Sequence, residues 1–158
     1  TEYCDVGFTD IKFYDQIIVD PIQVQFPGSQ LELLLLTGIN EQPNLFDFKI
    51  ALPNDVIEFR VESDDPVFHF QPFVVEAYPI VNFPQQFQPF LWIDPLNSFG
   101  LFGGLGNPLP IAPLDPLGSP HQFLVPPGMS GQDLMTQAIV IGPQGNPETS
   151  NGMVIRFN

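Results

Sequence analysis

The fold is decided by residues 121–158, which read HQFLVPPGMSGQDLMTQAIVIGPQGNPETSNGMVIRFN. Two runs place successive side chains on opposite faces: in LMTQAIVI (134–141), Leu134, Thr136, Ala138 and Val140 alternate with Met135, Gln137, Ile139 and Ile141, and in GMVIRF (152–157), Met153, Ile155 and Phe157 alternate with Val154 and Arg156. Alternation with a period of two predicts β-strands, and the segment between the two runs consists largely of turn-forming residues. The stretch therefore predicts an antiparallel strand pair. Because the sequence stops one residue after the second run, we expect that strand to close its sheet.

Further strands are predicted upstream of this pair. VIEFRVES (56–63) shows the clearest alternation, with Ile57, Phe59 and Val61 on one face and charged side chains on the other. A solvated face of this kind indicates an antiparallel sheet. The remaining strand-like runs are QIIVDPIQVQF (16–26), VFHFQPFVVEAY (67–78) and FLWID (90–94).

Two apolar runs lead to expectations about burial. LELLLLTGI (31–39) is too short for a membrane span and is predicted to be a strand buried on both faces. LFDFKI (45–50) alternates, and we expect its apolar face to lie inward and its charged face outward. The first face contains Phe46, Phe48 and Ile50, and the second contains Asp47 and Lys49.

The composition agrees with an all-β domain. The chain has 158 residues, enough for one domain with its own core. Its 19 Pro and 13 Gly disfavour long helices, and its 16 Phe supply apolar surface for a core. About eight short strands separated by turns indicate a single antiparallel two-sheet β-sandwich over residues 1–158, Ig-like or jelly-roll, with little or no helix.

A long Gly/Pro/Leu-rich connection, PLNSFGLFGGLGNPLPIAPLDPLGSP, covers residues 95–120. Connections of this length commonly carry a function or an interface. Its large apolar side chains either fold back onto the core or form an exposed adhesive surface. They include Phe99, Leu101, Phe102 and Leu105.

The charge balance excludes several classes of partner. Eighteen acidic residues against four basic ones give a formal net charge of −14. Nucleic acid and anionic membrane surfaces require the opposite sign, and no apolar run is long enough for membrane insertion. Because the sequence begins at Thr1 and not at Met, we expect a secreted or cell-surface chain whose signal peptide has been removed. The single cysteine, Cys4, is either a free thiol or an intermolecular cross-link.

The C-terminal half also carries a spaced set of turn and strand residues. They are Val125-Pro126, Leu134, Gln137-Ala138, Val140, Gly142-Pro143 and Asn151-Gly152, which follow the earlier LWIDP (91–95). This pattern resembles a β-sandwich domain that recurs near the C-termini of secreted proteins of planctomycetes and other environmental bacteria. The resemblance covers about the last 70 residues, and Gly142-Pro143 departs from the Asp-Pro of that family. It implies an extracellular β-sandwich module with no assigned chemistry.

Catalytic motifs are not evident. The sequence contains two histidines, His69 and His121, but no Gly-x-Ser-x-Gly motif that would supply a nucleophilic serine. Ser130 lies in a turn that the family named above also has. The run GLFGGLG (100–106) lacks the lysine and helix of a phosphate-binding loop. We therefore expect that the protein is not an enzyme and needs no cofactor.

Two binding sites remain as hypotheses. Glu62, Asp64 and Asp65 cluster at a predicted strand end, where they either ligate Ca²⁺ or form a solvated turn. An aromatic platform for a glycan is the other hypothesis, with packing in the core as its alternative. The aromatic residues concerned are Trp92, Tyr78, Tyr14 and Tyr3.

These observations favour an extracellular structural protein that associates with itself in a surface layer, filament or adhesive fibre. Few charges and many aromatic residues suit a surface used in interfaces. Residues 1–20 are a candidate arm that adds a strand to the open sheet edge of a neighbouring subunit. The expected interface residues are Cys4, Phe8, Phe13, Phe99 and Phe102. The alternative is a secreted module that binds carbohydrate or calcium and accompanies a larger protein.

Overall fold

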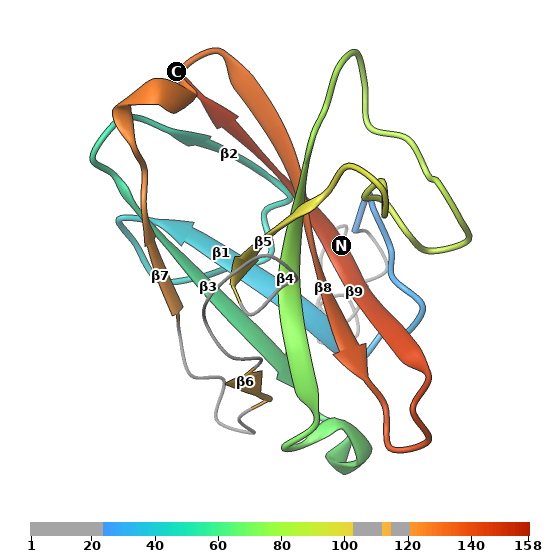
Figure 1. Cartoon of the computed structure of the whole chain (residues 1–158). Coiled ribbons are helices and arrows are strands. Elements are labelled where there is room, and N and C mark those ends of the chain that lie inside the picture. Colours follow the sequence, from blue (N-terminus) through green and yellow to red (C-terminus); the bar gives the residue numbers. More distant parts are fainter. Residues whose placement is uncertain (1–23, 103–111, 115–120) are drawn as a thin grey trace, which may run out of the picture.

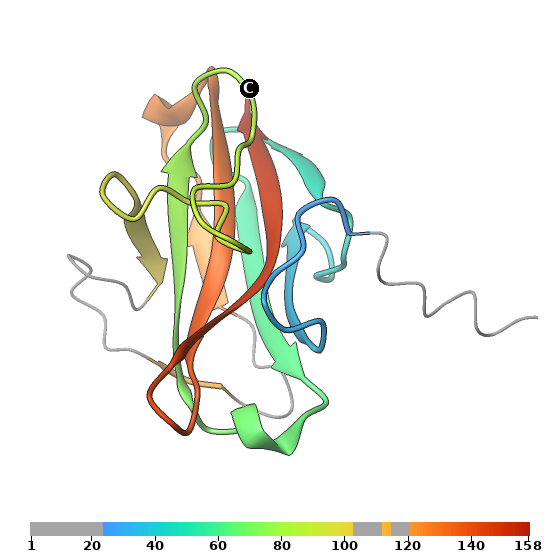
Figure 2. The same ribbon diagram turned by 90° about the vertical axis from the view of Figure 1, so that its right-hand side faces the viewer.

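The computed structural model describes residues 24–102, 112–114 and 121–158, within which two β-sheets pack face to face (Figures 1 and 2). The smaller sheet has the antiparallel order β1–β3–β7, formed by β1 (Leu33–Ile39), β3 (Val56–Ser63) and β7 (His121–Leu124). The larger sheet has the order β2–β9–β8–β4–β5, with β6 paired to β4. Its strands are β2 (Phe48–Ala51), β4 (Pro72–Pro79), β5 (Phe99–Phe102), β6 (Ala112–Pro113), β8 (Gln132–Ile141) and β9 (Pro147–Phe157).

The predicted all-β sandwich of two sheets is therefore confirmed. Helical structure in the described ranges is limited to two short 3₁₀ turns, η3 (Pro66–Phe68) and η4 (Pro127–Met129). A helix long and apolar enough to cross a membrane is not found among these residues. The long connection after residue 95 contributes β5 and β6, and Leu114 at its described end is fully buried in the core.

Strands β8 and β9 form the predicted antiparallel pair and are buried on both faces. Leu134 pairs with Ile155 and Met135 pairs with Val154. The first pair belongs to the main core between the two sheets, and the second pair belongs to a smaller cluster on the outer face. That cluster exists because residues 26–30 and the segment after β4 cover the outer face of the larger sheet.

Strand β9 does not close its sheet, which corrects one expectation. It lies between β8 and β2, and β2 joins it in parallel (Figure 1). The chain reaches β2 from β1 of the other sheet and then returns to β3. Two successive crossings between sheets place β2 beside the C-terminal strand, and no local pattern specifies such a distant partner.

The expected strand at 90–94 is also not formed. Only an isolated bridge, Gln88 to Leu91, precedes Trp92, and the segment is fixed by the buried side chain of Gln137 instead. The Gln137 amide donates to the carbonyls of Phe90 and Ser150 at 2.8 Å and accepts from the Trp92 N–H at 2.9 Å. This side chain replaces the strand partner that the segment lacks.

The first described residues run beside β9. The Gly152 N–H donates to the Phe26 carbonyl at 2.7 Å, and Ser29 exchanges hydrogen bonds with Thr149. Position 28 must be glycine, because a Cβ there would lie 2.2 Å from the backbone oxygens of Thr149 and Ser150. A strand was predicted at 16–26. Residues 24–26 form an irregular segment instead, and residues 16–23 lie outside the described residues.

Strand β1 is an edge strand whose outward edge is largely occupied. The Asn151 side chain reaches across from β9, accepts from the Leu35 N–H at 2.8 Å and donates to the Leu35 carbonyl at 3.0 Å. Nearby, Thr37 exchanges two backbone hydrogen bonds with Asn44. The predicted burial of β1 on both faces is only half correct, since Leu34 and Leu36 on the second face are intermediate in exposure.

Candidate interaction surface around strand β2

Strand β2 carries its large apolar side chains outward, contrary to the expectation for residues 45–50. We call four alternating apolar residues, two in β2 and two in the segments that flank it, the β2 stripe. The exposed fractions are 75% for Phe46, 46% for Phe48, 50% for Ile50 and 52% for Leu52. The parallel register explains the inversion, because it places Phe48 beside Val154 and Ile50 beside Arg156, which already face away from the core.

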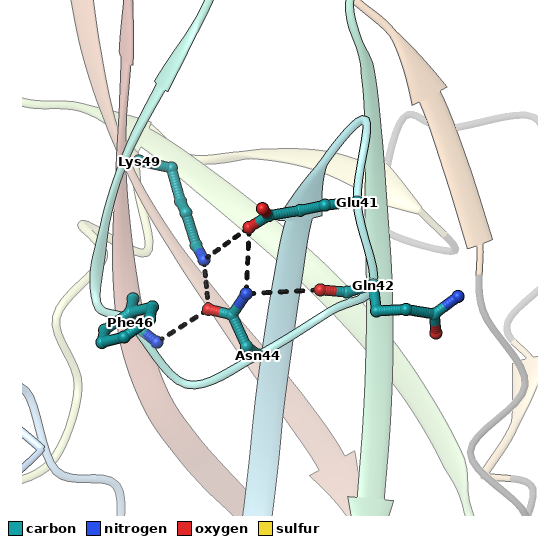
Figure 3. A network of polar contacts seen from close by, with 5 residues as sticks. All are labelled: Glu41, Gln42, Asn44, Phe46 and Lys49. Atoms are coloured by element: carbon teal, nitrogen blue, oxygen red, sulfur yellow. Dashed lines mark hydrogen bonds and ion pairs between the residues drawn. The ribbon is translucent and has the colours of Figure 1, made fainter.

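The same register turns Lys49 and Ala51 toward the core side of β9. Lys49 is only 7% exposed, and Ala51 is fully buried beside Phe157. The Lys49 ammonium is accommodated because it donates to the Asn44 side-chain carbonyl and lies 3.9 Å from a carboxylate oxygen of Glu41 (Figure 3). These two polar partners therefore allow a lysine to occupy the core-facing side of β2, where an apolar residue was expected.

The backbone edge of β2 is open toward the side opposite β9. The Asp47 and Ala51 carbonyls accept from the N–H groups of Val154 in β9 and of Asn158, which follows β9. Successive residues of a strand direct their backbone groups to opposite sides, so those of Phe48 and Ile50 point away from β9. Among the described residues, none bonds to these outward groups. An edge of this kind is a template for another strand.

A groove of about 240 Å³ adjoins the β2 stripe. We call it the β2 groove. Phe48 forms part of one wall, and the segment that follows β4 contributes the exposed Phe83. Its apolar lining residues are Phe26, Phe48, Ile80, Phe83, Pro84 and Val154, and its polar ones are Gln25, Asp47, Asn82, Asp133 and Arg156. A smaller, more polar hollow of about 230 Å³ continues past Arg156 toward the C-terminal residues.

The charged residues of the groove form one ordered pair. The Arg156 guanidinium donates to both carboxylate oxygens of Asp133, at 2.9 and 2.8 Å, and lies 5.3 Å from the centre of the Phe48 ring. The hydrogen bond from Arg156 lowers the pKa of Asp133, and the same contact raises the pKa of Arg156. The pair therefore stays ionised at neutral pH and holds the guanidinium against the aromatic ring.

The acidic residues predicted to bind Ca²⁺ lie at the end of β3. Glu62 is in the strand and Asp64 is exposed, while Asp65 accepts a hydrogen bond from the Val67 N–H at 3.0 Å and caps η3. Over residues 24–102, 112–114 and 121–158, no group of three or more His, Cys, Asp or Glu side chains is arranged to hold a metal ion. Calcium binding stays a prediction.

The residues predicted for the interface have different outcomes. Cys4, Phe8 and Phe13 lie outside the described residues. Phe99 begins β5 and is exposed, and Phe102 ends the same strand. Leu101 between them packs against the main core, and Leu105 lies outside the described residues. The stripe and groove at β2 were not predicted as an interface.

The aromatic residues considered as a glycan platform pack inside the molecule where the structure describes them. Trp92 is partly buried, meets Phe26 edge-on at 5.1 Å between ring centres, and donates from Nε1 to the Pro27 carbonyl at 2.9 Å. Tyr78 packs against the same cluster and against Phe87. Tyr3 and Tyr14 lie outside the described residues.

Neither histidine adjoins the β2 surface. His69 Nε2 lies 2.9 Å from the Ser63 carbonyl, close to η3. His121 begins β7 beside Phe73, and burial lowers its pKa. Ser130 is the C-cap residue of η4.

Comparisons with protein-family models, with curated proteins and with solved structures found no match for this chain. The resemblance to the secreted β-sandwich domain accordingly stays a prediction. The β2 surface is therefore the feature of the molecule that points to a function. Its signal in the sequence is the alternation of residues 46–52, with the apolar face directed outward and not inward.

Proposed function

We propose that this protein is a structural, self-associating subunit whose copies meet at strand β2. The observation that carries the proposal is the coincidence of an open backbone edge with the exposed β2 stripe. Strand addition supplies main-chain hydrogen bonds for affinity, and the side chains that flank the edge supply specificity. The extracellular or cell-surface location expected from the sequence belongs to the same proposal.

The donor in this proposal is the N-terminal segment 1–20 of a neighbouring subunit. Its apolar pieces VGF, IKFY and IIV have strand-forming composition, and its acidic residues recur between them. A donor segment and an acceptor edge at different places on one chain create a head-to-tail contact, which generates open polymers when the rotation between subunits does not close. The product expected is a filament or fibre.

The test compares the sedimentation of the full chain with that of two changed chains. Phe48→Ser removes the central ring of the stripe and should shift the protein toward monomer. Leu124→Ser is the matched control, because Leu124 is an exposed apolar residue on β7, an edge strand of the other sheet. Equal association of both variants and the parent would reject β2 as the interface.

Removal of residues 1–20 tests the donor separately. Loss of association with an unchanged fold, judged by circular dichroism, supports strand addition by this segment. Unchanged association rejects the segment as donor and leaves the side-chain contact at Phe48 as the remaining form of the interface.

The β2 groove favours a second candidate function, a secreted module that binds a neutral glycan. Aromatic faces at Phe48 and Phe83 next to a fixed carboxylate–guanidinium pair can stack against a sugar ring and bond its hydroxyls. A glycan array followed by calorimetry checks this candidate. Binding that Phe83→Ala abolishes would favour it over self-association.

A further inference from the structure

Lys49, Asn44 and Glu41 form a polar cluster beside the β2 stripe (Figure 3), and the Lys49 Nζ lies 5.4 Å from the centre of the Phe46 ring. Lys49 projects from the core-facing side of β2, and its Nζ donates to the Asn44 side-chain carbonyl oxygen. Asn44 lies in the connection between β1 and β2. The cluster thus places a largely buried primary amine against the carbonyl group of a side-chain amide.

The Asn44 side chain is held firmly in this position. Its backbone exchanges two hydrogen bonds with Thr37 of β1, at 2.9 and 3.1 Å. Its side-chain oxygen also accepts from the Phe46 N–H at 3.1 Å, and its nitrogen donates to the Gln42 carbonyl at 3.3 Å. A backbone N–H directed at a carbonyl oxygen stabilises negative charge that develops there during nucleophilic attack.

Glu41 contacts both nitrogen atoms of the pair. Its Oε2 accepts from the Asn44 side-chain nitrogen at 3.0 Å and lies 3.9 Å from the Lys49 Nζ. One carboxylate oxygen is therefore hydrogen-bonded to the nitrogen that would leave, and it must approach the nitrogen that would lose a proton by about 1 Å for direct transfer. A carboxylate placed between the two nitrogens can act as general base toward one and general acid toward the other once that contact tightens.

The surroundings of Lys49 increase the fraction of its neutral, nucleophilic form at a given pH. Burial lowers the pKa of Lys49, and the nearby charge of Glu41 opposes this effect only in part. A desolvated lysine is a common activated nucleophile, and a held geometry replaces a bimolecular encounter.

We propose that Lys49 and Asn44 become joined by an intramolecular amide bond, with Glu41 as the proton-transfer residue. The neutral Nζ attacks Cγ of Asn44, and the new N–C bond forms as the bond from Cγ to the side-chain nitrogen breaks. One proton passes from Nζ through Glu41 to the leaving nitrogen, which departs as ammonia. No oxidant, cofactor or other reactant is consumed. The product ties the connection after β1 covalently to β2, whose backbone has a partner on only one side within the described ranges.

The test is the intact mass of the denatured full chain, measured after incubation at neutral and mildly alkaline pH. We expect a mass below that of the unmodified chain by one ammonia molecule, and a linked peptide containing Asn44 and Lys49 after proteolysis. Glu41→Gln should slow the loss, and Lys49→Arg should abolish it. An unmodified mass after prolonged incubation would overturn the proposal.

A second variant separates this reaction from cyclisation of asparagine to a succinimide, which also releases ammonia and for which the Asn151-Gly152 pair is a candidate. Asn44→Asp can form the same amide by losing water, so its linked product should have the same mass as the linked parent chain. Hydroxylamine opens a succinimide and leaves the lysine amide intact. Ammonia loss that persists in Lys49→Arg or disappears with hydroxylamine would contradict the proposal.

Discussion

Strands β1 and β2 are both apolar edge strands, yet their edges differ. The edge of β1 is covered by the side chain of Asn151 and the backbone of Asn44, whereas the outward backbone groups of β2 have no partner in the described part of the chain. Proteins commonly protect edges because an exposed one invites pairing with another chain. The difference shows that, within the described residues, the edge of β1 is protected and the edge of β2 is left open.

The protection of β1 depends on one side chain. Asn151→Ala would remove both hydrogen bonds to Leu35 and leave the backbone groups of that buried residue without partners. Losing partners for two buried groups should lower the free energy of unfolding by about 3 kcal/mol. Urea unfolding measures this change, with the exposed Asn82→Ala as control at about 0.5 kcal/mol or less. A loss below about 1 kcal/mol would show that Asn151 does not secure β1.

The connection that covers β1 can be displaced by one methyl group. A Cβ on Gly38 would lie 2.2 Å from the Glu41 backbone oxygen, so Gly38→Ala must push this connection away from the strand. We expect a loss of about 2 kcal/mol, seen as a lower Tm in calorimetry. Gly128→Ala is the matched control, because a Cβ there meets nothing within 4 Å. Equal Tm values for the two variants would contradict this view of β1.

The groove beside β2 should respond to acid through Asp133. Its pKa in the folded protein is lowered below the ordinary value of 3.8 by Arg156, so the folded state binds the proton less readily than the unfolded chain. The stabilisation is complete above the ordinary pKa and disappears as the pH falls through the folded-state pKa. Asp133→Asn should therefore be slightly less stable than the parent at pH 6, and the difference should shrink as the pH falls below 3.8. A constant difference across that range in urea titrations would exclude this pair as the cause.

The sequence predicts a strand and its buried face correctly where apolar residues alternate with charged ones. Ile57, Phe59 and Val61 of β3 alternate with charged residues, and they are buried as expected. The β8–β9 pair was also found from its own pattern, since a turn of Gly and Pro residues directly joins the two strands.

The failures have a common physical cause, which is dependence on distant partners. Phe48 and Lys49 exchange their expected faces because β2 takes its register from β9, about a hundred residues later in the chain. The segment around Trp92 looks like a strand but receives its hydrogen bonds from the Gln137 side chain. The β2 stripe was not predicted as an interface because its apolar side chains face outward only in the register that β9 imposes on β2.

Sedimentation velocity of two variants at one position tests most directly whether β2 accepts a strand. Ile50→Ala and Ile50→Pro both remove the exposed side chain, but only proline also removes the backbone N–H that points away from β9. If association requires strand addition, Ile50→Pro should raise the dissociation constant at least about tenfold over Ile50→Ala. Circular dichroism should show that both variants keep the sandwich. Equal association of the alanine and proline variants would contradict strand addition at β2.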